Sequence, residues 1–232
     1  MSSQAPDASD VVDDIDASDE ETFDDEPGSP LARGTGRHSL RFLYALMGIS
    51  AIFCIVASAV LSIESYHLAL NPKAVLSCDI NAAISCGTVA QSWQATFFGF
   101  PNAFIGLASE PVVLTIAILG FCGTRFPRWF LFCAQVAYGL ALIFAYWLFV
   151  QSFFYIGALC PWCLIITVFT TITFFTLLHI SAIEKTLYLP PRAQRGLERA
   201  IEWHLDVIVP ALLLTTLAVM IMLKYGIQII NS

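Results

Sequence analysis

Long uncharged apolar stretches alternate with short polar segments along most of this chain. A helix needs about 20 mainly apolar residues to cross a hydrocarbon core of about 30 Å. The pattern predicts five membrane spans, over residues 42–63, 102–120, 129–150, 160–183 and 207–223. Gln151, Ser152 and Gly157 interrupt the uncharged run over residues 129–183 and place the break between the third and fourth spans there. We therefore expect an all-α polytopic membrane protein.

The same pattern predicts how the chain is organised. Residues 1–39 form a polar tail, residues 40–183 a four-helix transmembrane bundle with an outer loop at 71–100, residues 184–205 a cytoplasmic connection, and residues 206–232 a fifth transmembrane helix with a short outer tail. The first span is expected to fray through Glu64 and His67. Residues 93–100 are expected to lie at the membrane interface.

The composition agrees with a membrane protein, because 57% of the residues are hydrophobic and the mean hydropathy is +0.74. The formal charge of -7 is uneven, since eleven of the 18 acidic residues lie within residues 1–30, where there is no base. Such a tail cannot bury enough apolar surface to fold, so we expect it to be disordered. The remainder holds seven acids and all 11 bases, a net charge of +4. Membrane lipid is the expected environment, and no nucleic-acid partner is expected.

The basic residues are divided unequally between the two ends of the predicted spans. One side receives only Lys73 and Lys224, and the other receives nine residues: Arg33, Arg37, Arg41, Arg125, Arg128, Lys185, Arg192, Arg195 and Arg199. Basic residues favour the cytoplasmic side of a membrane, so we expect a cytoplasmic N-terminus and an outer C-terminus. The loop at 71–100 and the start of the fourth span then face the outside, where disulfide chemistry is expected.

The run Cys160-Pro161-Trp162-Cys163 opens the fourth span. Two cysteines on a first helical turn can close a disulfide, and the unpaired amides of a helix N-terminus favour the thiolate that exchange requires. Pro161 suits this turn, because its missing N–H would have had no helical acceptor. A zinc site would need four ligands at closed spacing, which Cys78 and Cys86 do not supply. We therefore expect a redox dithiol and no metal.

Cys78 and Cys86 form a second pair, in the polar loop at 71–100. Taken alone, two cysteines at this spacing are most often a structural disulfide. On the same side of the membrane as Cys160 and Cys163, they can instead exchange with a soluble partner and then with the helix dithiol, through successive mixed disulfides. We expect all four cysteines to be catalytic.

Four motifs stand in this order along the chain: Cys78-Asp79-Ile80-Asn81-Ala82-Ala83-Ile84-Ser85-Cys86, Ser92-Trp93, Phe100-Pro101-Asn102-Ala103 and Leu159-Cys160-Pro161-Trp162-Cys163. In these motifs, over roughly residues 40–183, the chain resembles the vitamin K epoxide reductase family in its bacterial, actinobacterial-type form. The resemblance implies a four-helix bundle that encloses a quinone beside the C-x-x-C motif. It also implies a thioredoxin-fold partner, which many members carry fused at the C-terminus. Because this chain ends at Ser232, a separate extracytoplasmic partner is expected.

The resemblance also assigns the two cysteine pairs. Cys160 and Cys163 match the active-site pair, with Cys163 expected nearest the quinone, and Cys78 and Cys86 match the loop shuttle pair. We expect a quinone-dependent thiol–disulfide oxidoreductase of the bacterial cytoplasmic membrane, with menaquinone as the electron acceptor. Two alternatives stay open. One is a quinone or quinone-epoxide reductase with another thiol donor, and the other is a noncatalytic membrane scaffold with a structural disulfide.

Five polar residues complete the candidate site. By resemblance, Ser92 lies near the quinone, Asn102 donates a hydrogen bond to a quinone oxygen, and Thr167 replaces a tyrosine of some animal members. Asp79, beside Cys78, either anchors the loop, tunes thiol exchange or is simply solvated. Glu110 lies within the second span, where a carboxylate is costly and is a functional candidate. It either serves a proton path or is hydrogen-bonded within the bundle.

The other cysteines, Cys54, Cys122 and Cys133, lie in apolar spans and are expected to be buried as small hydrophobic side chains. The aromatic residues within 147–155 either line a quinone cavity or form an interfacial belt, and the belt is the simpler explanation.

Overall fold

The computed structural model describes residues 39–80 and 84–230, and the regular elements of these ranges are helical. In chain order they are α1 (Leu40–Leu70), α2 (Cys86–Ala90), η3 (Trp93–Thr96), α3 (Ala103–Phe121), α4 (Arg128–Val150), η4 (Gln151–Ile156), α5 (Pro161–Ile183), α6 (Pro191–Glu202) and α7 (Leu205–Ile230). A single parallel bridge joins Ile84 to Leu159. The predicted acidic tail lies almost wholly outside the described residues.

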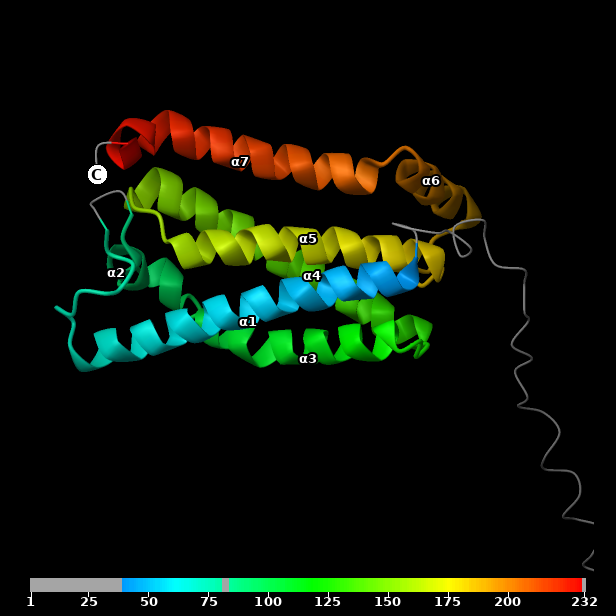
Figure 1. Cartoon of the computed structure of the whole chain (residues 1–232), viewed down its shortest axis with the longest axis horizontal. Helices are drawn as coiled ribbons and strands as arrows, with labels where there is room; N and C mark the ends of the chain where they lie inside the picture. Colours follow the sequence, from blue (N-terminus) through cyan, green and yellow to red (C-terminus); the bar gives the residue numbers. More distant parts are fainter. Residues whose placement is uncertain (1–38, 81–83, 231–232) are drawn as a thin grey trace, which may run out of the picture.

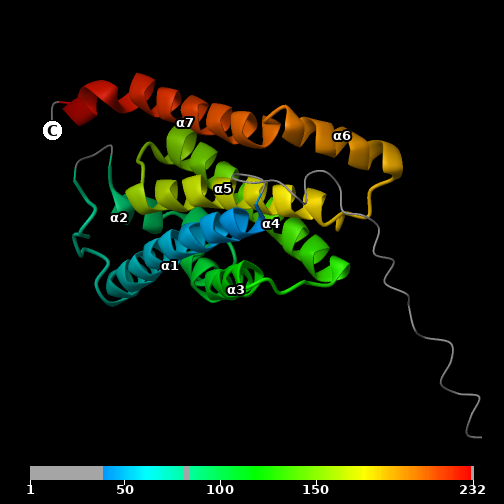
Figure 2. The ribbon, with the colours of Figure 1, turned by 45° about the vertical axis from the view of Figure 1, so that its right-hand side comes forward.

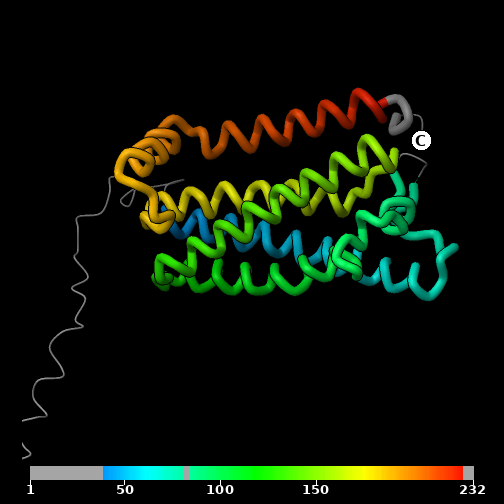
Figure 3. Tube along the Cα trace, turned by 180° about the vertical axis from the view of Figure 1, so that it is seen from behind, coloured from blue at the N-terminus to red at the C-terminus, as the bar shows by residue number. Residues whose placement is uncertain are grey.

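Within the described ranges, five helices are long and apolar enough to cross a membrane: α1, α3, α4 together with η4, α5 and α7. The expectation of an all-α, multi-pass membrane protein is therefore confirmed. Helices α1, α3, α4 and α5 pack as a bundle, and α7 lies along one side of it (Figure 1). The short α2 lies at one end of the bundle and α6 at the opposite end, as the rotated view also shows (Figure 2). Seen from behind, the C-terminal part of α7 lies at the same end of the bundle as α2 (Figure 3).

The predicted break between the third and fourth spans is present. Helix α4 continues into the π-helical turn η4, which ends at Gly157. Gly157 has a left-handed backbone (φ 77°), a conformation that glycine adopts without steric cost. Pro161 then starts α5, in which the fixed φ of proline fits the first helical position.

The helices differ from the prediction at three places. Helix α1 continues to Leu70 and does not fray at Glu64, because Glu64 is buried and hydrogen-bonded. Helix α7 runs to Ile230, beyond the predicted end at residue 223. The predicted polar connection contains the helix α6. Its apolar residues Leu197 and Ile201, four positions apart, pack against the core of the bundle.

Small residues bring α1 and α3 close together. A Cβ atom at Gly48 of α1 would lie 3.5 Å from the Cβ of Ala117 on α3. A Cβ atom at Gly106 of α3 would collide with the hydroxyl of Ser58 on α1. Membrane helices pack through such small residues because their backbones can then approach closely.

Polar contacts fasten α7 to the rest of the molecule near both of its ends. The Lys224 ammonium donates to the Phe153 carbonyl in η4 and lies 4.4 Å from the centre of the Phe153 ring. Toward the opposite end, His179 Nδ1 of α5 lies 2.8 Å from Asp206 Oδ2 of α7. Helix α7 is therefore held in place by side chains as well as by apolar packing.

We expect Gly106→Leu to destabilise the bundle, because the larger side chain has to displace Ser58 and push α3 away from α1. Overpacking of this kind typically costs about 1–3 kcal/mol. The midpoint of thermal unfolding in detergent should fall. Gly196→Ala on α6 is the matched control, since a Cβ atom there has no neighbour within 4 Å. An unchanged midpoint in Gly106→Leu would show that the close approach of α1 and α3 is not required.

Candidate active site

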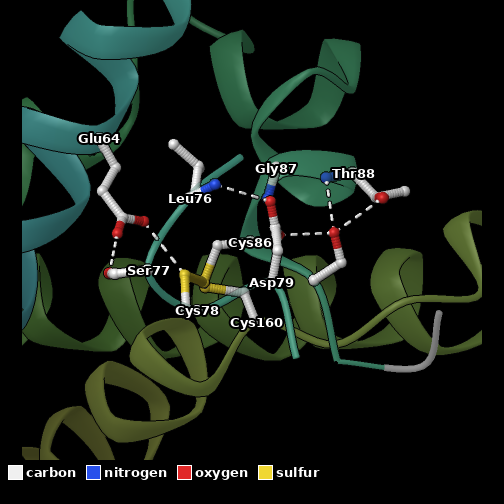
Figure 4. The surroundings of a disulfide bond; sticks show 10 residues. Glu64, Leu76, Ser77, Cys78, Asp79, Cys86, Gly87, Thr88 and Cys160 are labelled. Carbon is white, nitrogen blue, oxygen red and sulfur yellow. Dashed lines mark hydrogen bonds between the residues drawn. A yellow bond between two sulfur atoms is a disulfide. The ribbon is translucent and has the colours of Figure 1, made fainter. Parts of the chain in front are cut away.

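The four predicted cysteines meet at the end of the bundle where α2 lies. Cys78 and Cys86 form a disulfide with an S–S distance of 2.03 Å. The sulfur of Cys86 lies 3.1 Å from that of Cys160 (Figure 4). Cys160 and Cys163 are free thiols, and Cys163 is half-buried on the first turn of α5. An oxidised loop pair is therefore in contact with a reduced helix pair.

A short backbone pairing sets this contact. The Ser85 N–H donates to the Leu159 carbonyl at 3.0 Å, next to the bridge between Ile84 and Leu159. Ser85 and Leu159 each stand immediately before a cysteine. The pairing of these two residues therefore brings Cys86 and Cys160 side by side.

Asp79 organises the loop around the disulfide. Its carboxylate accepts hydrogen bonds from the Leu76 N–H at 3.0 Å, the Ser85 hydroxyl at 2.8 Å and the Gly87 N–H at 2.9 Å (Figure 4). Gly87 leaves room for the carboxylate, because a Cβ atom there would lie 2.8 Å from Asp79 Oδ2. Partial burial raises the pKa of Asp79, but its hydrogen bonds together lower that pKa below the ordinary value. Of the roles considered for Asp79, these contacts favour the loop anchor.

A cavity of about 390 Å³ lies inside the bundle against Cys86, Cys160 and Cys163. Side chains of α1, α3, α4 and α5 line it, most of them apolar. Its polar lining consists of Ser58, Ser65, Ser92, Gln94, Asn102, Ser109, Glu110, Ser152, Thr167 and Thr170. An apolar cavity with a few convergent polar groups is the usual form of a small-molecule site.

Asn102 and Ser92 both line this cavity, and their contact with a quinone stays a prediction. The Asn102 amide donates one hydrogen bond to the Gln94 carbonyl at 2.7 Å. Its oxygen Oδ1 is buried and has no partner among the described residues. The Ser92 hydroxyl donates to the Val89 carbonyl at 2.6 Å. A buried polar atom without a partner is costly, so Asn102 is suited to bind a ligand with its oxygen and its second N–H.

Glu110 is hydrogen-bonded within the bundle and also lines the cavity. The Tyr138 hydroxyl of α4 lies 3.0 Å from each oxygen of the Glu110 carboxylate, which is buried. The two interpretations of Glu110 are therefore compatible with each other. Thr167 also lines the cavity, and its hydroxyl donates to the Cys163 carbonyl at 2.9 Å.

Comparison with known protein families agrees with this arrangement. Residues 45–178, more than half of the chain, match the family model described as the vitamin K epoxide reductase family. The chain belongs to this family. Vitamin K epoxide reductase proteins are membrane oxidoreductases that use a quinone as electron carrier and generally work with thioredoxin-like partners. A search of curated proteins found no match to the chain.

In this vitamin K epoxide reductase family member, aromatic residues form part of the cavity wall. Phe149 is buried and lines the cavity, so the belt explanation is wrong for it, whereas Tyr155 is 76% exposed and fits a belt. Trp147 packs against Trp93, with 6.1 Å between ring centres. Sequence reasoning missed most of the wall that α4 contributes: Ala137, Leu140, Ala141, Phe144, Ala145 and Leu148. Their spacing of three and four is a signal that could have found this face.

The three remaining cysteines do not share one environment. Cys54 is buried in the bundle, as expected. Cys122 and Cys133 are exposed, so their predicted burial is wrong. Cys122 follows the last residue of α3, and Cys133 lies in the second turn of α4. An apolar stretch can equally well face lipid, and hydropathy alone does not separate these two environments.

Glu64, Cys78 and Cys86 bring ligand-type atoms within 4.8 Å of one another. The two sulfurs are bonded to each other, and a disulfide sulfur is not the thiolate that binds zinc. The absence of a metal therefore stays a prediction.

We expect Asp79→Asn to loosen the cysteine loop, because hydrogen bonds to a charged carboxylate are stronger than those to an amide. The folded-state pKa of Asp79 is lowered, so the stability that it contributes is present above the unfolded value of about 3.9 and is lost as the pH falls through the lowered folded value. Hydrogen exchange of the Gly87 N–H should show strong protection at neutral pH in the wild type. Protection in Asp79→Asn should be weaker and should not change over the acidic range. Equal protection at neutral pH would contradict the anchor.

Proposed function

We propose that this chain reoxidises a thioredoxin-fold, disulfide-forming partner outside a bacterial cytoplasmic membrane and passes the electrons to a membrane quinone. The observation that carries this proposal is the 3.1 Å contact between the sulfurs of Cys86 and Cys160, with a disulfide on one side and free thiols on the other. The cavity against Cys163 supports a quinone site. A scaffold with one structural disulfide leaves both features without a role.

In this proposal the electrons move through two thiol–disulfide exchanges within the chain. The loop pair begins reduced and the helix pair begins oxidised. The Cys86 thiolate attacks Cys160 and displaces the Cys163 thiolate. Cys78 then attacks Cys86, forms the loop disulfide and releases Cys160 as a thiolate. The products are an oxidised loop pair and a reduced helix pair, the same states that the structure contains.

We propose that Cys78 is the loop cysteine that exchanges with the partner protein. Cys86 already faces Cys160 and is 1% exposed, whereas Cys78 is 6% exposed. Attack of a partner thiolate on Cys78 releases Cys86, the sulfur that has to reach Cys160. The second thiol of the partner then attacks the mixed disulfide and frees Cys78, and the partner leaves oxidised.

The polar residues of the cavity fit a quinone head group. A bound quinone accepts two electrons and two protons, and the electrons leave the helix pair as Cys160 and Cys163 close their disulfide. Asn102 offers its second N–H to a quinone carbonyl, and its unpaired Oδ1 to a hydroxyl of the quinol. Ser92 adds a hydroxyl acceptor, and Glu110 supplies a carboxyl group on the cavity wall that could exchange a proton with the quinone. We propose menaquinone as the acceptor, on the resemblance to actinobacterial-type members.

The orientation that we propose places the cysteines on the outer face. Among the described residues, only Lys73 and Lys224 lie at the cysteine end, while the other bases lie at the α6 end: Arg41, Arg125, Arg128, Lys185, Arg192, Arg195 and Arg199. The α6 end is then cytoplasmic. Arg33 and Arg37 lie outside the described residues. The division of the chain after residues 39, 183 and 205 is part of this proposal.

Cys163→Ala should abolish quinone-linked thiol oxidation, because the helix pair can no longer close a disulfide. The measurement is reduction of a short-chain menaquinone by purified protein, with reduced dithiothreitol as the thiol donor. Cys54→Ala is the control, since Cys54 is buried away from the relay and should leave turnover close to that of the wild type. Full turnover by Cys163→Ala would remove the proposed function.

The orientation predicts which thiols can be labelled in intact cells. After mild reduction, an impermeant maleimide should modify the loop cysteines Cys78 and Cys86 from outside. Cys122 is exposed at the opposite end of α3 and should react only after the membrane is broken. The reverse order of labelling would invert the proposed topology.

A further inference from the structure

Glu64 is a buried carboxylate that the proposed electron route does not use. It lies on α1 with 7% of its surface exposed. One carboxylate oxygen accepts a hydrogen bond from the Ser77 hydroxyl, and the other lies 3.1 Å from Cys78 Sγ (Figure 4). No cationic side chain in the described part of the chain forms an ion pair with it. A buried charge without a counter-charge is costly, so its position against a reacting sulfur points to a chemical role.

Glu64 also has a route out of the bundle. It lies 24 residues after Leu40, the first residue of α1, which is about 36 Å along the helix and exceeds a hydrocarbon core of about 30 Å. A cleft of about 440 Å³ lies here between α1 and residues 74–77, and both Glu64 and His67 line it. The carboxylate therefore contacts Cys78 on one side and this cleft on the other.

Cys78 needs a proton acceptor at one step of the relay. Only a thiolate attacks a disulfide efficiently, and an ordinary cysteine has a pKa of about 8.5. A thiol of this ordinary kind is mostly protonated near neutral pH, so a nearby proton acceptor would speed its attack on a disulfide. The N-terminus of α5 favours a thiolate at Cys160, its own N-cap residue, but Cys78 lies in the loop and caps no helix.

We propose that Glu64 is the proton acceptor for Cys78 in the second internal exchange, an inference that rests on the electron route above. In the mixed disulfide between Cys86 and Cys160, the Cys78 thiol gives its proton to Glu64 as its sulfur attacks Cys86. The bond between Cys78 and Cys86 forms and the bond between Cys86 and Cys160 breaks. The electron pair stays on Cys160 as a thiolate. The proton on Glu64 passes to water through the cleft.

The groups that titrate around Glu64 come from four places in the described chain. They are His67 on the same helix, Cys78 in the loop, Cys86 at the start of α2 and Cys160 before α5. His67 is the one imidazole among these groups and lines the same cleft as Glu64. A His67→Gln background therefore separates its effect from that of Glu64.

Single-turnover disulfide mapping on the full-length protein tests the proposal. Fully reduced protein is mixed with duroquinone, a fully substituted quinone that does not alkylate thiols, and quenched in acid at successive times. In Glu64→Gln the bond between Cys78 and Cys86 should form at least about tenfold more slowly near pH 7, because a general base typically contributes 10²- to 10⁴-fold. The mixed disulfide between Cys86 and Cys160 should accumulate. The defect should shrink toward pH 9.5, because an ordinary cysteine thiol ionises without a base at that pH.

Ser77→Ala is the matched control, because it removes the other contact of Glu64 and leaves the carboxylate facing Cys78. It should form the loop disulfide at nearly the wild-type rate. Glu64→Asp keeps a shorter carboxylate and should fall between wild type and Glu64→Gln. It also provides the test if the glutamine variant does not fold.

Three results would overturn the proposal. They are a wild-type rate in Glu64→Gln, a defect of equal size at both pH values, and the same mixed disulfide accumulating in Ser77→Ala. Each would mean that Glu64 only holds the loop. If the wild-type protein forms no disulfide with duroquinone, the quinone-linked function fails. The same series started with diamide as the oxidant then still measures the attack by Cys78 and decides the role of Glu64.

Discussion

The backbone hydrogen bond between Ser85 and Leu159 is the contact on which the rest of the site depends. It joins two segments that are distant in the sequence and fixes their register, so that the cysteine after each of them meets the other. A shift by one residue would turn the side chains to opposite faces of the extended backbone. The hydrogen bonds of Asp79 and the left-handed turn at Gly157 support this register, because they fix the two extended segments that form it.

Two carboxylates flank the sulfurs on opposite sides. Glu64 faces the loop disulfide and a cleft at the end of α1, and Glu110 faces the inner cavity beside Tyr138. Thiol oxidation releases protons, and quinone reduction consumes them. In the proposed relay, an ionisable group at each end would let the electron pair move inward without protons passing through the sulfurs. This separation suits a membrane enzyme whose two substrates arrive from different phases.

Much of the fold could be predicted because hydropathy reports burial in lipid or protein directly. The five spans, the break before Gly157 and the position of the cysteine pair at the start of α5 all follow from local pattern. Glu64 was expected only to fray the end of α1, since its partner Cys78 comes from a segment whose path the sequence does not reveal. The burial of Cys54 and the exposure of Cys133 also depend on which face of a uniformly apolar helix turns inward. Hydrophobic periodicity is weak where both surroundings are apolar.

The segment that matches the family ends at residue 178, so helix α7 lies beyond it. Lys224 of α7 nevertheless donates to the Phe153 carbonyl in the π-helical turn that leads to Leu159 and Cys160. A π-helical turn departs from regular α-helical hydrogen bonding, and the ammonium group gives the Phe153 carbonyl a strong partner. A minimal version of this protein, trimmed to the family boundary at residue 178, would keep every cysteine but lose the Lys224 contact that supports the segment before Cys160. The family boundary is therefore a poor guide to the smallest intact form of this molecule.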